Sequence, residues 1–388
     1  MKKNILLVAP YSSLPSDRFV NRFSYLALKL AERGHTTTFV TGKFSHRMKD
    51  FHRSEALPSY ENLKVVLIDN RAYRSHVGIK RVLSLRDFHK NFEKRFPTLD
   101  EFDVIYSAYP PIGHNLAILR YLDRKKTRFI VDIQDVWPES FSSVLPSLQA
   151  ISPHLLPFAR SANKVYANAD AIIAVSRTYL ERALSVHPDV KSHVAYIGTE
   201  FDMINTVPKS GGPTRLFYIG TLSYSYDIET VIRAVHDLAS MGREIEFNIF
   251  GNGPDLTRLQ SLPHKGTIFH GHVPYKELEA RLREQHIAVN SIRSKAPQSV
   301  TNKLCDYLGL GCPILNSQEC AEARSLLSKV THRNYRAGDI ASAKEEISSL
   351  LDDNAIHATW RSDATFSREA ISRSIIDFVE MIEPRDLA

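Results

Sequence analysis

Short, mostly apolar runs recur along this chain, and the stretches between them carry apolar residues at every third or fourth position. The first pattern predicts strands that are buried on both faces, and the second predicts helices with one apolar face. Residues 4–9, 102–107 and 129–132 are runs of the first kind. Residues 18–33 follow the second pattern and are followed by Gly34, a residue type that suits the end of a helix. The pattern therefore predicts alternating strands and helices.

This alternation forms two series with a break between them. The first series lies within residues 1–205 and the second within residues 214–363, and the stretch between them shows no periodicity. Repeated strand-then-helix units predict doubly wound parallel sheets, which bind ligands at the carboxyl ends of their strands. We predict an α/β protein with two facing Rossmann-like domains and a cleft between them. We expect a final helix within residues 364–388 to cross back to the first domain.

The length and composition indicate a globular protein of two domains. A chain of 388 residues is too long for one ordinary core. No apolar run reaches the roughly 18 residues of a membrane span, and the first apolar run is better explained as a buried strand than as a signal peptide. The three cysteines, Cys305, Cys312 and Cys320, lack metal-binding spacing, so we expect thiols in a reducing compartment.

The net charge of +7 is concentrated in one region of the chain. Residues 43–95 contain 13 Lys and Arg against six Asp and Glu. Clustered cations attract anionic lipid or nucleic acid, or they form a solvated face. No helix-turn-helix or interleaved aromatic pattern supports nucleic acid. We therefore expect this region to contact an anionic membrane surface at the inner face of the cell membrane, with a merely solvated face as the alternative.

Candidate binding residues are densest around a predicted helix that begins near Val300 and ends at Gly309 and Gly311. The N-terminus of a helix presents free N–H groups and a partial positive charge, which suit a phosphate, and Lys303 adds a full charge in the first turn. Asp306 follows one turn later and can accept hydrogen bonds from ribose hydroxyls. The residues that we expect to bind a nucleoside diphosphate here are Arg293, Lys295, Ser299, Thr301, Asn302, Lys303 and Asp306.

The segment NKLCDYLGLGCPIL at residues 302–315 resembles the donor-site helix of the glycosyltransferase group 1 family, also called glycosyltransferase family 4. Four further segments resemble the family in the same order along the chain, namely residues 132–140, 218–222, 249–254 and 269–278. The resemblance covers most of the chain. It implies the GT-B architecture, with an acceptor-binding domain at residues 1–205 and a nucleotide-sugar-binding domain at residues 214–363.

The resemblance also implies donor-binding roles for three turns of the second domain. Gly220 and Thr221 follow a predicted strand, where a glycine lets the backbone approach a diphosphate. The turn that contains Gly251 and Gly253 and the turn that contains His272 would frame the nucleobase. Ordinary turn chemistry explains the first of these two turns equally well.

The chain departs from the family pattern at three places. Gln298 stands where the family has a glutamate, Thr221 stands where it has an arginine or lysine, and Tyr226-Asp227 stands where it has Lys-Gly. The phosphate charge must then be met from elsewhere. Our candidates are Arg293, Lys295 and Lys303, and arginine suits bidentate phosphate contact better than lysine.

The first domain offers fewer candidates. Asp135 and Glu139 follow a predicted strand, where a carboxylate can receive the acceptor's proton or stabilise positive charge at the anomeric carbon. We favour Asp135 as the catalytic residue and Glu139 second, with a helix cap as the alternative role of Asp135. Arg18 and His114 also follow predicted strands and are candidates for acceptor binding, against positions on the surface or in the core. No metal-binding spacing and no Asp-x-Asp motif is present, so we expect neither a metal nor another cofactor.

The resemblance implies a hexosyltransferase-type enzyme that uses a UDP- or GDP-sugar. The acceptor would be a hydroxyl of a lipid-linked or growing cell-surface glycan, and the family implies retention at the anomeric carbon. A nucleotide-sugar 2-epimerase of the same architecture and an inactive nucleotide-sugar-binding subunit stay open as alternatives. A dinucleotide-dependent oxidoreductase is disfavoured, because no Gly-x-Gly-x-x-Gly follows the first strand.

Overall fold

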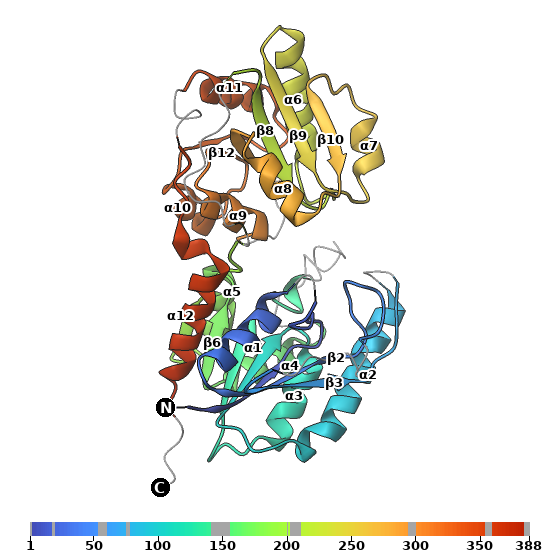
Figure 1. Cartoon of the computed structure of the whole chain (residues 1–388), viewed down its shortest axis with the longest axis vertical. Helices are drawn as coiled ribbons and strands as arrows, with labels where there is room; N and C mark the ends of the chain where they lie inside the picture. The colour runs from blue at the N-terminus through green and yellow to red at the C-terminus, as the bar shows by residue number, and fades with distance from the viewer. Residues whose placement is uncertain are drawn as a thin grey trace. The chain divides into compact units, whose positions relative to one another are not determined.

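The computed structural model describes residues 2–17, 20–52, 60–74, 78–140, 156–199, 201, 211–293, 300–353 and 359–383. The chain divides into two compact units (Figure 1). Unit 1 comprises Met1–Tyr196 with Ile371–Ala388, and unit 2 comprises Ile197–Ala370. Each unit contains one parallel sheet with helices packed on it, so the predicted α/β fold class with two Rossmann-like domains is confirmed.

The sheet of unit 1 has seven strands in the order β3-β2-β1-β4-β5-β6-β7 among the described residues. Their bounds are β1 (Asn4–Val8), β2 (Thr36–Gly42), β3 (Leu63–Ile68), β4 (Val104–Tyr109), β5 (Arg128–Ile133), β6 (Ala171–Ala174) and β7 (Lys191–Val194). The strand order reverses between β1 and β4. In doubly wound sheets, ligands bind beyond the carboxyl ends of the strands at such a reversal.

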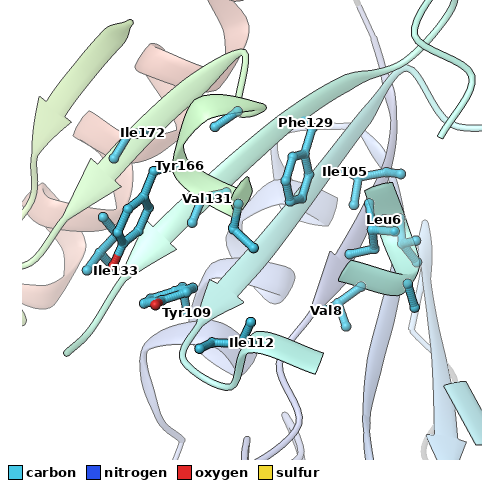
Figure 2. Packing of buried hydrophobic residues seen from close by; sticks show 14 of the residues in the cluster. Leu6, Val8, Ile105, Tyr109, Ile112, Phe129, Val131, Ile133, Tyr166 and Ile172 are labelled. Atoms are coloured by element: carbon cyan, nitrogen blue, oxygen red, sulfur yellow. The ribbon is translucent and has the colours of Figure 1, made fainter. Parts of the chain in front are cut away.

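Two helical layers cover this sheet. One face is covered by α2 (Ile79–Arg95), α3 (Ile112–Tyr121), α4 (Ala159–Ala167) and α5 (Arg177–Leu184), and the other by α1 (Arg22–Glu32) and α12 (Arg368–Glu380). Successive side chains of a strand point to opposite faces. Figure 2 accordingly shows Leu6 and Val8 in the core under the first layer, whereas Ile5 and Leu7 pack with the second.

A buried lysine attaches the last helix to unit 1. Lys3 Nζ donates to the Val379 carbonyl oxygen at 2.9 Å and also to the carbonyls of Glu380 and Ile382. The last carbonyl groups of a helix have no partner within the helix, so a cation placed there satisfies them. In addition, Ile375 of α12 is fully buried in the core on this side of the sheet.

The sheet of unit 2 has six described strands in the order β10-β9-β8-β11-β12-β13. Their bounds are β8 (Thr214–Ile219), β9 (Ile245–Phe250), β10 (Thr267–Gly271), β11 (Ile287–Asn290), β12 (Ile314–Asn316) and β13 (His332–Asn334). The helices are α6 (Ile228–Ser240), α7 (Leu256–Gln260), α8 (Tyr275–Leu282), α9 (Asn302–Leu310), α10 (Ala321–Leu327) and α11 (Ile340–Leu351). Short 3-10 helices span Phe96–Thr98 and Ala364–Phe366. The strand order of unit 2 reverses between β8 and β11.

No helix in the described parts of the chain has the length and apolar character needed to cross a bilayer. The predicted helix at residues 18–33 begins later than expected, at Arg22. Asn21 caps it, because its side chain accepts from the Ser24 N–H while Ser24 reaches back to the Asn21 N–H. Arg18 lies outside the described residues, so its predicted acceptor-binding role cannot be placed on an element.

Candidate functional site

The N-terminus of α9 is built as the sequence predicts. Thr301 has an extended backbone and caps the helix, and its hydroxyl oxygen accepts from the Leu304 N–H at 3.2 Å. Asn302 is exposed at the first helical position. The helix ends at Gly311, whose φ of 68° lies in the left-handed region. A Cβ at Gly311 would lie 1.9 Å from the Arg361 carbonyl oxygen, so both the backbone conformation and the space require glycine there.

A hydroxyl group attaches α9 to the carboxyl end of β8. The Tyr307 hydroxyl oxygen accepts from the Ile219 N–H at 3.0 Å, and the Tyr307 ring packs edge-on against Phe217 of the same strand. Lys303 lies one helical turn before Tyr307. This attachment therefore brings the first turn of α9 over the residues that directly follow β8.

Those residues, Gly220–Asp227, form a segment that we call the β8 loop. Lys303 Nζ lies 3.5 Å from the centre of the Tyr226 ring and 5.5 Å from that of Tyr218. Contacts of this kind attract the charged form of lysine electrostatically. Burial lowers the pKa of Lys303 to about 7, although Asp306 acts to raise it. The ammonium group is thus held by aromatic rings, and it titrates near neutral pH.

Gly220 makes room for this lysine. Its φ is +130°, and a Cβ at this position would lie 2.6 Å from Lys303 Cε. Any side chain here would therefore displace Lys303 from the β8 loop. The sequence predicts Gly220 as a donor-binding residue through its backbone, and the structure adds that Gly220 is required by the path of Lys303. Thr221 follows on the exposed side of the loop.

Two further glycines bring the turns after β8 and β9 together. The ladder between these strands continues past their ends, because Gly220 N donates to the Phe250 carbonyl oxygen and Leu222 N donates to that of Asn252, both at 2.9 Å. A Cβ at Gly251 would lie 1.8 Å from Gly220 O, and one at Gly253 would lie 2.1 Å from Leu222 O. Backbone packing thus accounts for Gly251 and Gly253 without a ligand, as the alternative interpretation of this turn expects.

Arg293 approaches the same loop from the end of β11. Its backbone N–H donates to the Ser225 carbonyl oxygen at 3.0 Å, and its guanidinium lies 4.5 Å from the centre of the exposed Tyr224 ring. Nε of Arg293 is buried, and among the described residues it has no hydrogen-bond partner. The structure thus brings Arg293 and Lys303 to one loop. Two further predicted residues of this group, Lys295 and Ser299, lie outside the described residues.

Asp306 faces different neighbours. Burial raises the pKa of its carboxyl group to about 7, whereas a hydrogen bond from the Thr199 side chain and the charge of Lys303 both act to lower it. Thr199 also packs on Gly309, where an added Cβ would lie 2.5 Å from Thr199 Cγ2. Part of the hydrogen-bonding capacity of Asp306 is therefore used within unit 2.

His272 is exposed in the turn after β10. His270, two positions earlier, is the histidine that contacts a neighbouring strand and a helix. Its Nε2 lies 2.7 Å from Asn248 Oδ1, its Nδ1 lies 3.0 Å from the Arg281 guanidinium, and its ring stacks on Phe250. The sequence offered no signal for His270, because its partners come from other elements.

The predicted catalytic carboxylates of unit 1 hold the turn after β5. Asp135 accepts from the Val136 N–H at 2.8 Å, from the Ser140 hydroxyl at 3.0 Å and from the Trp137 indole N–H at 3.2 Å. Burial raises the pKa of Asp135, and these three hydrogen bonds oppose that rise. Glu139 forms an ion pair with Arg182 of α5. The contacts of Asp135 hold the turn locally, but they are not those of a helix cap, which accepts from backbone N–H groups two or three positions further on.

His114 is a core residue. Its side chain is 1% exposed, and its Nε2 lies 3.0 Å from the Ala108 carbonyl oxygen. The rings of Phe88 and Phe92 pack edge-on to it, and burial lowers its pKa to about 3. The predicted acceptor-binding role is therefore corrected, because the imidazole has almost no exposed surface with which to touch a substrate.

Sequence reasoning missed a buried charged group in unit 1. Asp132 of β5 is fully buried and accepts from Arg22 Nε at 2.9 Å, from the Tyr106 hydroxyl at 2.5 Å and from the Gln134 amide at 2.6 Å. Arg22 also donates to the carbonyl oxygens of Ala195 and Tyr196. The sequence did carry a signal for this group, namely an aspartate inside an otherwise apolar run. Such an aspartate is expected to be buried, and a buried carboxylate needs a cation nearby.

Comparison with known protein families decides the class of this chain. A model described as "Glycosyl transferase 4-like domain" matches residues 20–197, and a model described as "Glycosyl transferases group 1" matches residues 213–353. The two models cover unit 1 and unit 2 in the order that the family requires. This chain belongs to the glycosyltransferase group 1 family.

Solved structures of glycosyltransferases share the fold of this one. Sucrose-phosphate synthase from Thermosynechococcus elongatus is 15% identical with a TM-score of 0.72, and the match covers 98% of this chain and 99% of that one. HepE of Anabaena in complex with UDP-glucose is 14% identical with a TM-score of 0.63, over 98% and 100% of the two chains. The lipopolysaccharide outer core galactosyltransferase WaaB is 13% identical with a TM-score of 0.62, over 97% and 99%. A search of the curated proteins found no match.

The β8 loop of this glycosyltransferase departs from the family's pattern of cations. Where the family carries an arginine or lysine and then Lys-Gly, this chain carries a threonine and Tyr226-Asp227, and the two tyrosines of the loop contact Arg293 and Lys303 instead. Sequence reasoning listed both cations and missed both tyrosines. Within the described residues, no group of three or more His, Cys, Asp and Glu side chains is placed to hold a metal ion.

Proposed function

We propose that this glycosyltransferase transfers a hexosyl group from a UDP- or GDP-sugar to a hydroxyl of a lipid-linked or growing cell-surface glycan, with retention at the anomeric carbon. The observation that carries the proposal is the position of Lys303. Lys303 places a cationic side chain in the first turn of α9, against the loop that directly follows β8 at the strand-order reversal of unit 2. HepE of Anabaena, a structural neighbour, was solved with UDP-glucose.

The chemistry follows from the charges at the β8 loop. When the sugar leaves its nucleotide, negative charge develops on the departing diphosphate, and Lys303, Arg293 and the N–H groups of α9 are the groups that stabilise it. Preorganised charges in a site of this kind act more strongly than they would in water. Binding of the dianion in turn favours the protonated form of Lys303, so the pKa of this lysine rises from about 7 when the donor binds.

A thermal-shift screen of the full-length protein against UDP, GDP and their sugars tests the donor site. A ligand at 100 times its Kd adds about 2.7 kcal/mol to the free energy of unfolding, which gives a clear rise in melting temperature. We expect one nucleotide class to produce this rise in the wild-type protein and to produce much less in Lys303→Met. If no nucleotide raises the melting temperature, the proposed donor site is wrong.

Product analysis separates the proposed transfer from the epimerase alternative. With donor and an acceptor preparation from membranes, we expect the radiolabelled sugar to appear in a lipid-extractable or polymeric product. We also expect transfer to persist in EDTA, since we propose that the reaction needs no metal. Release of a free, altered sugar from the donor without any acceptor would instead indicate the 2-epimerase.

We further propose that unit 1 contacts an anionic membrane surface through α2. Ile79 is 78% exposed and Val82 is 64% exposed near the start of this helix, among basic residues that include Lys80 and Arg86. Exposed apolar side chains and clustered cations are the two features that bind interfacial helices to anionic bilayers. We expect the wild-type protein to sediment with vesicles that contain phosphatidylglycerol. The double variant Ile79→Ser/Val82→Ser should sediment with them to a smaller extent. Equal sedimentation of the two proteins would contradict this role.

A further inference from the structure

A second group of cations and aromatic rings lies in unit 1, apart from the candidate donor site and mostly within the basic region of residues 43–95. We call it the β1–β3 cluster, and its members are Tyr11, His46, Lys49, Tyr73 and Arg81. Tyr11 follows β1, His46 and Lys49 follow β2, Tyr73 follows β3, and Arg81 lies in the first turn of α2. Since β1, β2 and β3 are parallel neighbours, the loops after them lie at one edge of the sheet. This is the carboxyl edge, where α/β proteins bind their ligands.

Ring contacts join the members of the cluster. Lys49 Nζ lies 4.8 Å from the centre of the Tyr73 ring, and the Arg81 guanidinium lies 5.2 Å from that of Tyr11. His46 connects the two tyrosines, because its Nδ1 is 2.5 Å from the Tyr73 hydroxyl and its ring centre is 5.6 Å from that of Tyr11. Lys49 and Arg81 thus each lie over an aromatic ring, and a ring attracts a cation without neutralising it. Arg81 takes part in further interactions as well.

Two polar groups of the cluster, Lys49 Nζ and the Tyr11 hydroxyl, are buried without a hydrogen-bond partner among the described residues, and Lys49 is the charged one. Its Nζ is shielded from solvent and has no hydrogen-bond partner in the described part of the chain. Burial lowers the pKa of Lys49, and the charge of Arg81 lowers it further. A shielded ammonium group without a partner is unfavourable, because it has lost water without gaining an acceptor. An anion that bound here would supply the missing acceptor.

The backbone around Lys49 is fixed in a conformation that is rare for lysine. Its φ is +57°, in the left-handed region, and its N–H donates to the Ser45 carbonyl oxygen at 3.0 Å. Phe44 and Phe51 pair across this segment in an antiparallel bridge. Unfavourable backbone conformations persist where the surrounding structure holds them, and they are frequent at ligand clamps.

Nearby carboxylates are engaged with other partners. Asp69 pairs with Lys43 at 3.3 Å, and Asp87 forms an ion pair with Arg71. Asp50, the neighbour of Lys49, accepts from the Phe51 N–H at 2.8 Å. None of these three contacts neutralises Lys49, so its positive charge stays available to a ligand.

We propose that the β1–β3 cluster binds an anionic group, a phosphate or a carboxylate, carried by the sugar acceptor. Lys49 supplies one charge and Arg81 supplies a planar donor group that suits two oxygens of the anion. The naming of this substrate class rests on the proposed transferase function. Binding of the anion itself does not, because the cluster lies in unit 1 and shares no residue with the β8 loop or α9.

Calorimetric titration of the full-length protein with inorganic phosphate tests the site. Phosphate also has a candidate site at Lys303, so the titrations are made in a Lys303→Met background. We expect Lys49→Met/Arg81→Met to bind phosphate about tenfold or more weakly, as the loss of charged hydrogen bonds predicts. The matched control is Lys94→Met, which removes one exposed charge from the far end of α2 and should leave the affinity unchanged.

Arg81→Gln alone provides a second variant that leaves the fixed backbone at Lys49 intact, and we expect weaker phosphate binding there as well. Equal affinity in the background protein and in both cluster variants would overturn the proposal. Glucose 1-phosphate, glucuronate and glucose then distinguish the source of the anion. A phosphate site binds the first more tightly than the second, a carboxylate site reverses this order, and equal binding of all three sugars would also overturn the proposal.

Nucleotide titrations of the wild-type protein and of Lys49→Met/Arg81→Met keep the two proposals separate. We expect the same nucleotide affinity in both proteins. If phosphate binding depends on Lys49 and Arg81 while no nucleotide binds at all, the anion site stands and the donor site falls. If nucleotide binds but the substitutions at Lys49 and Arg81 leave phosphate binding unchanged, the donor site stands and the anion site falls.

Discussion

Two buried cations, one in each unit, are held in different ways. In unit 2, Lys303 lies over the rings of Tyr218 and Tyr226. In unit 1, Arg22 lies against the carboxylate of Asp132. A ring attracts a cation without cancelling its charge, whereas a carboxylate neutralises it. The difference indicates that Lys303 is kept for a ligand and that Arg22 serves the fold. The same reasoning places Lys49, over Tyr73, with the first kind.

The largest effect is expected when the carboxylate-paired cation is removed. Arg22→Met leaves the charge of Asp132 buried without its cation, which costs about 3–5 kcal/mol of unfolding free energy. The matched control is Arg33→Met, because Arg33 pairs with Asp377 and Glu380 at the exposed surface, where such pairs contribute about 0–1 kcal/mol. Urea denaturation followed by circular dichroism measures both. Equal stability of the two variants would remove the distinction between the two kinds of cation.

Removal of the ring-held cation should affect activity instead. We expect Lys303→Met to lower kcat by about 10²–10³, as the loss of one preorganised charge at a departing group predicts. Its unfolding free energy should change little. Unlike Arg22, Lys303 forms no direct ion pair with a carboxylate of the described residues, so its removal leaves no buried charge without a partner. Lys265→Met, which removes an exposed charge from the same unit, is the control. A kcat within about twofold of wild type would show that Lys303 does not act on the departing diphosphate.

The next largest effect is expected when the Tyr226 ring, which contacts Lys303, is removed. Tyr226→Leu removes a cation–π contact of up to about 2 kcal/mol, so we expect a decrease in kcat/KM of up to roughly 30-fold. Tyr226→Phe retains the ring and should retain most of the activity. Steady-state kinetics at saturating acceptor compares the three proteins. If the Phe and Leu variants lose activity equally, the hydroxyl rather than the ring is what matters.

The pH dependence of nucleotide binding gives the smallest effect for a single step, of up to about tenfold for one pH unit. The pKa of Lys303 in the free protein is about 7, so the lysine is charged below this pH and loses its proton above it. The Kd of the nucleoside diphosphate should therefore rise by up to about tenfold per pH unit above pH 7, until the pKa of the bound state is reached. Calorimetric titrations from pH 6 to pH 9 measure this slope.

A second group near Lys303 titrates over the same range. The pKa of Asp306 is also raised to about 7, and its ionisation adds a negative charge that weakens anion binding in the same direction. Asp306→Asn separates the two groups. We expect the slope to persist in Asp306→Asn and to vanish in Lys303→Met, and the reverse result would assign the titration to Asp306.

Part of the candidate site follows from local sequence alone. The cap at Thr301, the glycine at the end of α9 and the position of Lys303 in its first turn each depend on residues within a few positions of one another. Local chemistry of this kind can be interpreted without knowledge of the rest of the fold. It located the N-terminus of α9 to within two residues.

Other features depended on contacts between distant segments. His114 appeared to be a candidate ligand because it follows a strand, but α2 supplies Phe88 and Phe92 to bury it. The buried Asp132 needed Arg22, which is 110 positions away. No periodicity connects such partners, because their proximity arises only when the helices pack on the sheet.

The sequence by itself determined the two strand-and-helix series and the family, and it singled out the cations of the candidate donor site, since these depend on local periodicity and on short motifs. Only the tertiary structure decided what holds each cation. Tyr226 meets Lys303 because Tyr307 attaches α9 to the end of β8, and Lys49 meets Tyr73 because β2 and β3 are neighbours in the sheet. Pairing of distant strands and helices sets these distances, and with them the choice between a neutralised cation and one that remains charged for a ligand.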